Sequence, residues 1–276
     1  MIKDIVVNLP LTTERNATTS FATSLASSFN AHLSGIAFIY EPIIPVVEIG
    51  AAVSAKYIEE QQAEAKKLAQ AAIDNFNFEN RREAISSTAH CVETSDAGAP
   101  GRFAEFARCF DLAIVGQPKP DAPGMDDLIA EASFFESGRP TLIVPYIQRG
   151  TFRPDRIVIC WNGSRVATRA IADAMPFLKR AKNIEVITIS GERPIRDELP
   201  GADIAQHLAR HDLKVDLKAL SMATDTATTI LNFAADTGAD MLVMGAYGHS
   251  RLREFVLGGA TRGILETMTV PTLMSH

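Results

Sequence analysis

The chain repeats itself once, and this internal repeat constrains the fold more than any other sequence feature. Three segments of the first half reappear in the same order in the second: 4–8 as 156–162, 111–116 as 240–245, and 140–144 as 271–274. The joint lies near residues 148–154, which are rich in Arg, Gly and Pro. Three matches in one order indicate a tandem duplication, which predicts two domains, 1–148 and 153–276.

Each half alternates short apolar runs with longer amphipathic stretches. Uninterrupted apolar runs are typical of strands buried on both faces of a parallel sheet. The predicted strands are 5–9, 33–39, 87–92, 112–115 and 141–144, then 157–160, 185–189, 215–220, 241–244 and 272–274. Predicted helices include a stripe of Phe21, Leu25 and Phe29, the stretch 58–73, and a helix that Ser164 caps. The pattern predicts an α/β fold of two tandem doubly wound domains, each with a five-stranded parallel sheet.

Charge differs between the two halves. The chain has a net charge of −6, which disfavours a nucleic-acid partner. Residues 1–148 hold 11 Lys and Arg against 19 Asp and Glu, whereas residues 149–276 hold 16 against 14. The first half is therefore at −8 and the second at +2, and the second suits an anion better. With three scattered cysteines and no long apolar window, we expect a reduced cytoplasmic protein that makes no membrane contact.

A glycine-rich loop follows the fourth predicted strand of the second half. Ligands of open α/β sheets bind beyond the carboxyl ends of the strands, so this loop is the first place to look for a site. Its glycines are Gly245, Gly248, Gly258 and Gly259. Glycine allows close backbone approach and positive φ, and the helix that starts near Gly259 would offer free N–H groups to a phosphate. Thr261 adds a hydroxyl, and His249, Arg251 and Arg253 add positive charge. The loop predicts phosphate binding, although a glycine turn before an ordinary helix would look similar.

The spacing G-x2-G-x9-G in this loop, with the opening strand 157–164 and the closing strand 270–273, resembles the universal stress protein family. The resemblance covers essentially the full chain as a tandem pair and implies the adenine nucleotide α-hydrolase type of fold. It also implies that ATP, with or without Mg²⁺, binds in the cleft of the second domain. Gly245, Gly248 and Gly258 match the phosphate-binding glycines. The residues that would approach the ribose or base are Asn162, Gly163 and Ser164.

Two positions depart from the family pattern. Asn162 stands where an acidic residue is usual, so hydrogen bonding is kept while a charge and a candidate metal ligand are lost. Gly259 stands where Ser or Thr is usual directly after the last glycine, although Thr261 keeps the hydroxyl two residues further on.

The corresponding loop of the first half, residues 116–127, lacks the phosphate-binding pattern. It has no second glycine at the right distance, three prolines that remove N–H donors, and three aspartates that repel phosphate. We therefore expect the first domain to be degenerate for ATP and to pair with the second about a pseudo-twofold axis. That pairing would resemble the homodimer of single-domain relatives, and a further homodimer stays open.

Other chemistries have weak signals. His207 and His211 lie four apart, but the Glu of an HExxH motif and a third ligand are missing, so no metal site is predicted. No catalytic residue is predicted, and any ATP hydrolysis should be slow. The leading hypothesis is an adenine-nucleotide-binding protein with a regulatory, stress-response output. The alternatives are an ATP-dependent enzyme acting on a small molecule and an interaction module that binds no nucleotide.

Overall fold

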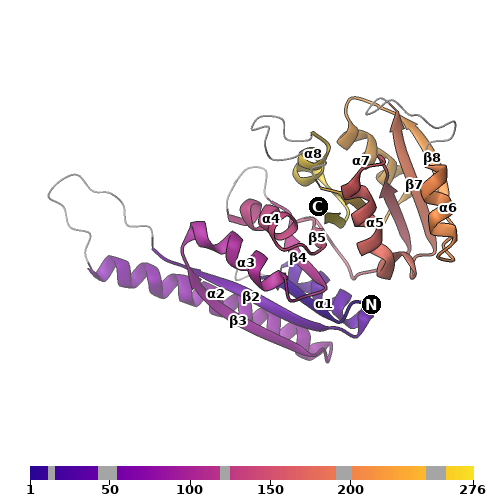
Figure 1. Cartoon of the computed structure of the whole chain (residues 1–276). Helices are drawn as coiled ribbons and strands as arrows, with labels where there is room; N and C mark the ends of the chain where they lie inside the picture. The colour runs from indigo at the N-terminus through magenta and orange to yellow at the C-terminus, as the bar shows by residue number, and fades with distance from the viewer. Residues whose placement is uncertain (12–15, 43–54, 119–124, 191–200, 247–258) are drawn as a thin grey trace.

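The chain alternates strands and helices from end to end in a computed structural model that describes residues 1–11, 16–42, 55–118, 125–190, 201–246 and 259–276 (Figure 1). The first half contains β1 (Asp4–Asn8), α1 (Ala17–Phe29), β2 (His32–Tyr40), α2 (Ala55–Arg82), β3 (Ser87–Thr94), a 3₁₀ turn (Asp96–Gly98), α3 (Ala99–Ala107), β4 (Leu112–Gly116), α4 (Met125–Glu136) and β5 (Thr141–Val144). The second half contains β6 (Arg156–Cys160), α5 (Arg165–Leu178), β7 (Asn183–Ser190), α6 (Ala202–Ala209), β8 (Asp216–Ser221), α7 (Thr226–Thr237), β9 (Met241–Gly245), α8 (Gly259–Thr267) and β10 (Thr272–Ser275). All ten predicted strands are confirmed.

The strands form one continuous sheet in the order β3-β2-β1-β4-β5-β10-β9-β6-β7-β8. Each half has the same internal order, and its strands are parallel. We predicted two sheets, and the structure joins them because β5 and β10 pair antiparallel, with Leu142 opposite Leu273. This pairing satisfies two strand edges that would otherwise be open. It also relates the two halves by a pseudo-twofold axis between these leucines.

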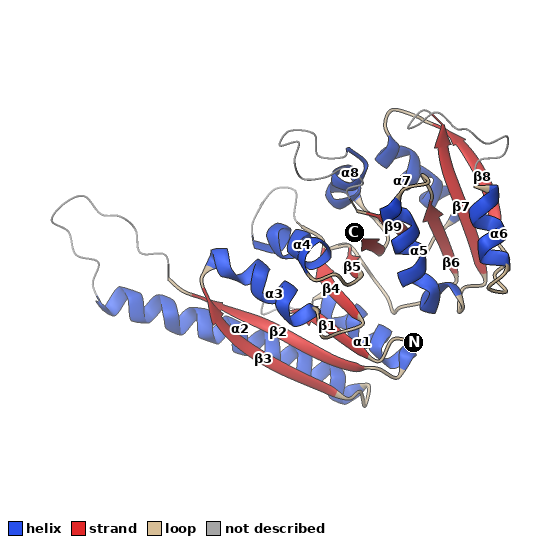
Figure 2. Cartoon of the chain, viewed as in Figure 1, coloured by secondary structure: helices blue, strands red, loops and turns tan. Residues whose placement is uncertain are grey.

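Helices cover both faces of the sheet (Figure 2). Buried side chains of α1, α2, α5 and α6 share one core cluster, and those of α3, α4, α7 and α8 share the other. Alternate strand residues serve the two faces, so that Ile5 and Val7 belong to the first cluster and Val6 to the second. This double burial explains why the central strands are apolar, whereas the edge strands β3 and β8 are half-buried or exposed and carry polar residues.

Aromatic rings join the halves on the α1–α5 face. Phe29 of α1 contacts Phe177 of α5 edge to face, with ring centroids 5.4 Å apart. Phe152, in the segment between the halves, contacts Phe21 at 5.7 Å and Phe177 at 5.9 Å. The connecting segment is therefore packed into the core, which helps to hold the halves in one arrangement.

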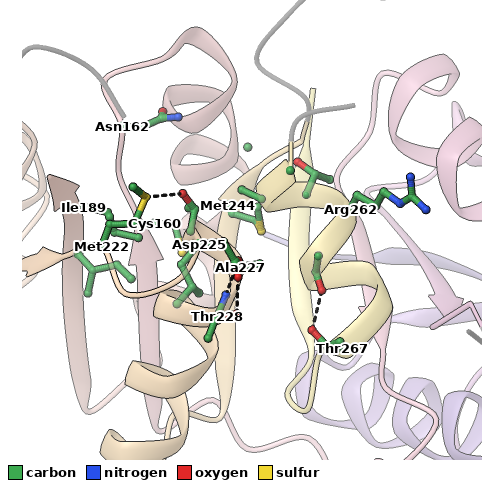
Figure 3. A pocket seen from close by; sticks show the side chains of 18 of the residues that line it. Cys160, Asn162, Ile189, Met222, Asp225, Ala227, Thr228, Met244, Arg262 and Thr267 are labelled. Atoms are coloured by element: carbon green, nitrogen blue, oxygen red, sulfur yellow. Dashed lines mark hydrogen bonds between the residues drawn. The ribbon is translucent and has the colours of Figure 1, made fainter. Parts of the chain in front are cut away.

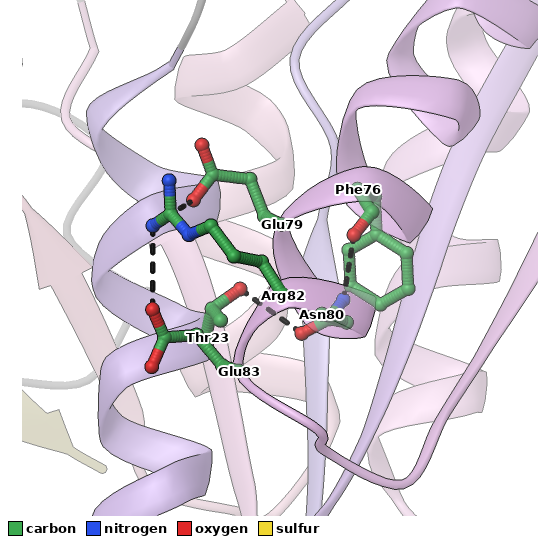
Figure 4. A network of polar contacts seen from close by, with 6 residues as sticks. All are labelled: Thr23, Phe76, Glu79, Asn80, Arg82 and Glu83. Carbon is green, nitrogen blue, oxygen red and sulfur yellow. Dashed lines mark hydrogen bonds and ion pairs between the residues drawn. The ribbon is translucent and has the colours of Figure 1, made fainter.

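Helix α2 differs most from its counterpart α6. It has 28 residues, against 8 in α6, and extends past the region 58–73 that the sequence predicted. Its last turns are fixed to α1 by a polar network, in which the Thr23 hydroxyl donates to Asn80 Oδ1 (3.0 Å) and Asn80 Nδ2 donates to the Phe76 carbonyl (2.9 Å; Figure 4). Arg82 forms ion pairs with Glu79 and Glu83 beside it.

Two further observations concern the hydrophobicity of the described helices and the state of the three cysteines. None of the helices in the described part of the chain combines the length and apolarity that a membrane crossing needs. Cys91, Cys109 and Cys160 are free thiols.

Candidate functional site

A cavity of about 820 Å³ lies in the second half, at the carboxyl ends of its central strands. The ends of β6, β7 and β9 form its floor, and the first turns of α7 and α8 form its walls (Figure 3). The volume lies in the range of small-molecule sites, and the position is the one expected for a ligand of an open α/β sheet.

The floor of the cavity is apolar and rich in sulfur. It is built from Cys160, Ile187, Ile189, Met222 and Met244. Ile187 and Met244 are buried in the α7–α8 core, whereas Ile189 is half-buried and Met222 is 46% exposed at the rim. Such a surface favours a flat apolar group over a charged one.

The α7 wall carries a negative charge. Asp225 caps α7 by accepting hydrogen bonds from the Thr228 N–H (2.9 Å) and from the Thr228 hydroxyl (2.6 Å). These hydrogen bonds hold the pKa of Asp225 below its usual value, so the carboxylate is ionised at neutral pH. The N-terminus of α7 is therefore already neutralised by its own side chain.

The α8 wall has a different character. Gly259, Ala260 and Thr261 line the cavity at the start of the helix, where the first amides have no partner within the helix. Arg262 follows with 60% of its side chain exposed, and its Nε donates to Glu266 at 2.7 Å. An anion is consequently favoured at the start of α8 rather than at that of α7.

A glycine brings the two helices together. A Cβ added at Gly263 of α8 would lie 2.6 Å from the Cβ of Ala227 in α7, closer than carbon atoms can approach. The absence of a side chain at Gly263 therefore lets both helix N-termini face one cavity.

The structure places the predicted site residues in three groups. Asn162, Gly245, Gly259 and Thr261 line the cavity. Gly163 and Ser164 do not line it, because Gly163 makes the turn after β6 with a φ of +68° and Ser164 is buried as the cap of α5. Five residues of the predicted loop lie outside the described residues: Gly248, His249, Arg251, Arg253 and Gly258.

The reason for a glycine at position 245 differs from the one we expected. Its φ is not in the positive range, and an added Cβ would lie 2.6 Å from the backbone N of Ala167. The first turn of α5 packs directly on this residue, so glycine is required for helix packing. Ligand approach alone does not explain it.

Sequence reasoning missed the α7 wall. Asp225, Thr226 and Thr228 lie at the start of α7, a short loop after β8, and line the cavity. Their signal was a helix N-cap: an Asp three residues before a Thr, shortly after a strand. Trp161 and Arg262 also line the cavity and were not predicted.

The described residues also bear on metal binding. In that part of the chain, no three His, Cys, Asp or Glu side chains gather in a way that could hold a metal ion. His207 and His211 are exposed, with ring centroids 4.9 Å apart.

Residues 154–276 match the universal stress protein family model. Over 44 residues, the chain is 41% identical to a universal stress protein of Synechocystis, and this match spans 16% of the chain and 15% of that relative. Solved structures that are similar over nearly the full length include the following three. A universal stress protein from Archaeoglobus fulgidus has 14% identity and a TM-score of 0.70, over 98% of this chain and 95% of that one. A protein of unknown function from Pseudomonas aeruginosa has 15% identity and a TM-score of 0.59, over 99% and 92%. A putative universal stress protein from another strain of P. aeruginosa has 17% identity and a TM-score of 0.56, over 99% and 93%.

These matches agree with the repeat in the sequence and with the ten-stranded sheet. The solved structures establish the fold of the whole chain, and the family model establishes the sequence pattern of its second half. Residues 154–276 therefore carry the universal stress protein family pattern, and the whole chain has the fold of a solved universal stress protein, with its tandem halves joined in one sheet.

Proposed function

We propose that the cavity binds an adenine nucleotide, ATP with or without Mg²⁺, and that binding has a regulatory output. The observation that carries the proposal is the pairing of an apolar floor with the start of α8 in one cavity. A nucleotide needs both features, because its base is flat and largely apolar and its phosphates are anionic.

The lining residues suggest how the two ends of a nucleotide would be held. Ile189 and Met244 would contact the base, and the amides of Gly259 and Ala260, with Thr261, would hold the phosphates. The Asp225 carboxylate would disfavour phosphate at the opposite wall, so it supports one orientation. Asn162, which is exposed at the rim and accepts from the Ser164 N–H (3.1 Å), would meet the ribose.

The glycine spacing of the loop adds support. Gly248, His249, Arg251 and Gly258 match or flank the family's phosphate-binding pattern in sequence. Their contribution is proposed from the sequence, because these four residues lie outside the described residues.

A slow or absent hydrolysis is part of the proposal. The carboxylates that line the cavity in the described residues are Asp225 and Glu266. Asp225 bonds to Thr228, and Glu266 pairs with Arg262 at 2.7 Å. Since general-base catalysis needs a carboxylate positioned on the attacking water, these engaged groups favour binding over turnover.

Fluorescence offers a direct test, since Trp161 is the single tryptophan of the chain and lines the cavity. Titration with ATP should change its emission, and calorimetry should give the same affinity. The decisive variant is Gly259→Asp, which puts a carboxylate where the phosphates would lie. Among the described residues, a Cβ added at this position meets nothing within 4 Å, and Asp is favourable in the first turn of a helix, so the fold should hold.

The expected result is a loss of ATP affinity of more than about tenfold in Gly259→Asp, with adenosine affinity nearly unchanged. Gly259→Ser is the neutral control at the same position. Leu128→Asp is the matched control in α4 of the first half, where Leu128 is 49% exposed, and it should leave ATP binding unchanged. Absence of ATP binding by the wild type at millimolar concentration would refute nucleotide binding, and steady ATP turnover would refute a purely regulatory role.

A further inference from the structure

One side chain of the first half reaches across the junction to α8. Gln117 follows β4, is only 4% exposed, and donates from Nε2 to the carbonyls of Leu265 (3.0 Å) and Glu266 (3.4 Å). Its Oε1 accepts from the Tyr146 N–H (3.3 Å), and its own N–H donates to the Val144 carbonyl (2.8 Å). Both ends of the buried amide are therefore satisfied, which fixes its orientation.

The two carbonyls that Gln117 binds lie in the last turn of α8. A helix leaves its last carbonyls without partners of its own, and a nine-residue helix has little stability apart from its neighbours. The opposite end of α8 lines the cavity with Gly259, Ala260 and Thr261. The helix therefore joins Gln117 at one end to the cavity at the other.

The pseudo-twofold partner of this contact is different. The residue equivalent to Gln117 is Ala246, because the N–H of each donates to the last parallel strand, to Val144 and to Ser275 respectively. Ala246 cannot reach a helix end with its side chain. Instead, His276 Nδ1 contacts the Ala246 carbonyl (3.0 Å), and its ring packs on Phe135 of α4 at 4.8 Å. The side-chain amide of Gln117 therefore binds the carbonyls at the end of α8, the helix that lines the cavity. Ala246, the equivalent residue of the second half, makes no such contact.

We propose that Gln117 is a positioning residue through which the first half holds α8 in place for the ligand in the cavity. The identity of that ligand rests on the proposed function, whereas the contact between Gln117 and α8 does not depend on it. This contact gives the first half a role in ligand binding. The first half supplies no phosphate contact itself, but it fixes the helix that does. Occupancy of the cavity and the order of the junction would then be coupled through α8.

Hydrogen exchange on the full chain without nucleotide tests the hold on α8. In Gln117→Leu, the amides of residues 263–268 should exchange about three- to tenfold faster, because two hydrogen bonds to the end of the helix are lost. Gln117→Glu keeps the size but replaces the donor by a carboxylate, and should act in the same direction. The control is Gln148→Leu in the same region, since the Gln148 side chain donates to the neighbouring Arg149 carbonyl (3.4 Å) and not to α8.

The same variants then enter the ATP titration, where Gln117→Leu should weaken binding about three- to tenfold and Gln148→Leu should not. Exchange in α1, measured in the same samples, should stay unchanged and so show that the fold is intact. Unchanged exchange in α8 of a folded Gln117→Leu would overturn the inference. Faster exchange with unchanged ATP affinity would overturn the coupling, and wild-type protein that binds no ATP would overturn the proposed function alone.

Discussion

The two halves of the chain share one strand order but differ at the carboxyl ends of their strands, where the second half has a cavity and the first half a buried ring. In the second half, Ile189 is half-buried on the floor of a cavity. Its equivalent in the first half is Phe38, which is 1% exposed, as the matching Leu9–Ile36 and Trp161–Ile187 backbone hydrogen bonds establish. A larger ring therefore takes up space in the first half that the second half leaves open.

The helix that follows the fourth strand differs in the same sense. Counting back from Pro140 and Pro271, Leu128 occupies the position of Gly259, Ala130 that of Thr261, and Glu131 that of Arg262. The first half thus has an apolar side chain, a methyl group and an acid where the second half has a glycine, a hydroxyl and a base. The second half therefore has the residue types that the proposed anion site needs at this helix, and the first half does not.

The largest expected difference between the halves concerns the glycine that ends the fourth strand. Gly245→Ala would place a Cβ 2.6 Å from backbone atoms of α5, whereas the Cβ of Gly116→Ala would meet, within the described part of the chain, only the Thr18 hydroxyl at 3.0 Å. We expect Gly245→Ala to lower the free energy of unfolding by about 3 kcal/mol and Gly116→Ala by less than about 1 kcal/mol. Urea denaturation of both variants measures this, and equal losses would contradict the assignment of Gly245 to helix packing.

The next prediction tests the space above the floor. Ile189→Phe places in the cavity the residue type that the first half has at Phe38. It should weaken ATP binding about tenfold, because the larger ring fills space that the base would occupy. Stability should change little, since the added ring enters open space. Phe38→Leu is the counterpart in the first half: it should cost about 1 to 2 kcal/mol of stability and leave ATP affinity unchanged. Trp161 fluorescence and urea denaturation give both quantities, and undiminished ATP binding by Ile189→Phe would place the base elsewhere.

A smaller effect is expected at the junction. His276→Ala removes the ring that packs on Phe135 at 4.8 Å, and should lower the free energy of unfolding by about 1 kcal/mol. A double-mutant cycle with Phe135→Ala isolates this contact, because each single variant removes the same ring pair. Additive losses would show that the two rings are energetically independent.

The sequence predicted the fold better than the site because the two depend on different kinds of information. A buried strand such as Leu112–Gly116 is a local apolar run, which the sequence shows directly. The ten strands of the structure were all predicted from such local patterns. The joining of the sheets at Leu142 and Leu273 depends on strand edges 131 residues apart, which no local pattern specifies. Gly245 was found for the wrong reason, since the spacing of glycines does not reveal that α5 packs on it. The cap residue Asp225 was readable, but only the structure places α7 beside α8.

The smallest predicted effect contrasts the caps of the two equivalent helices α3 and α7. Asp225 caps α7 with its side chain, whereas Gly98 before α3 has no side-chain cap. The folded-state pKa of Asp225 is lowered by the Thr228 hydrogen bonds, so its stabilising effect is complete above the unfolded pKa and is lost as pH falls through the folded one. The rate of amide hydrogen exchange in α7, divided by the rate in α3, should therefore rise below about pH 4. At pH 7, Asp225→Ala should accelerate it about three- to tenfold, and Asp225→Asn should do so less because Asn also caps. In both variants this pH dependence should vanish, and its persistence would show that another group governs the start of α7.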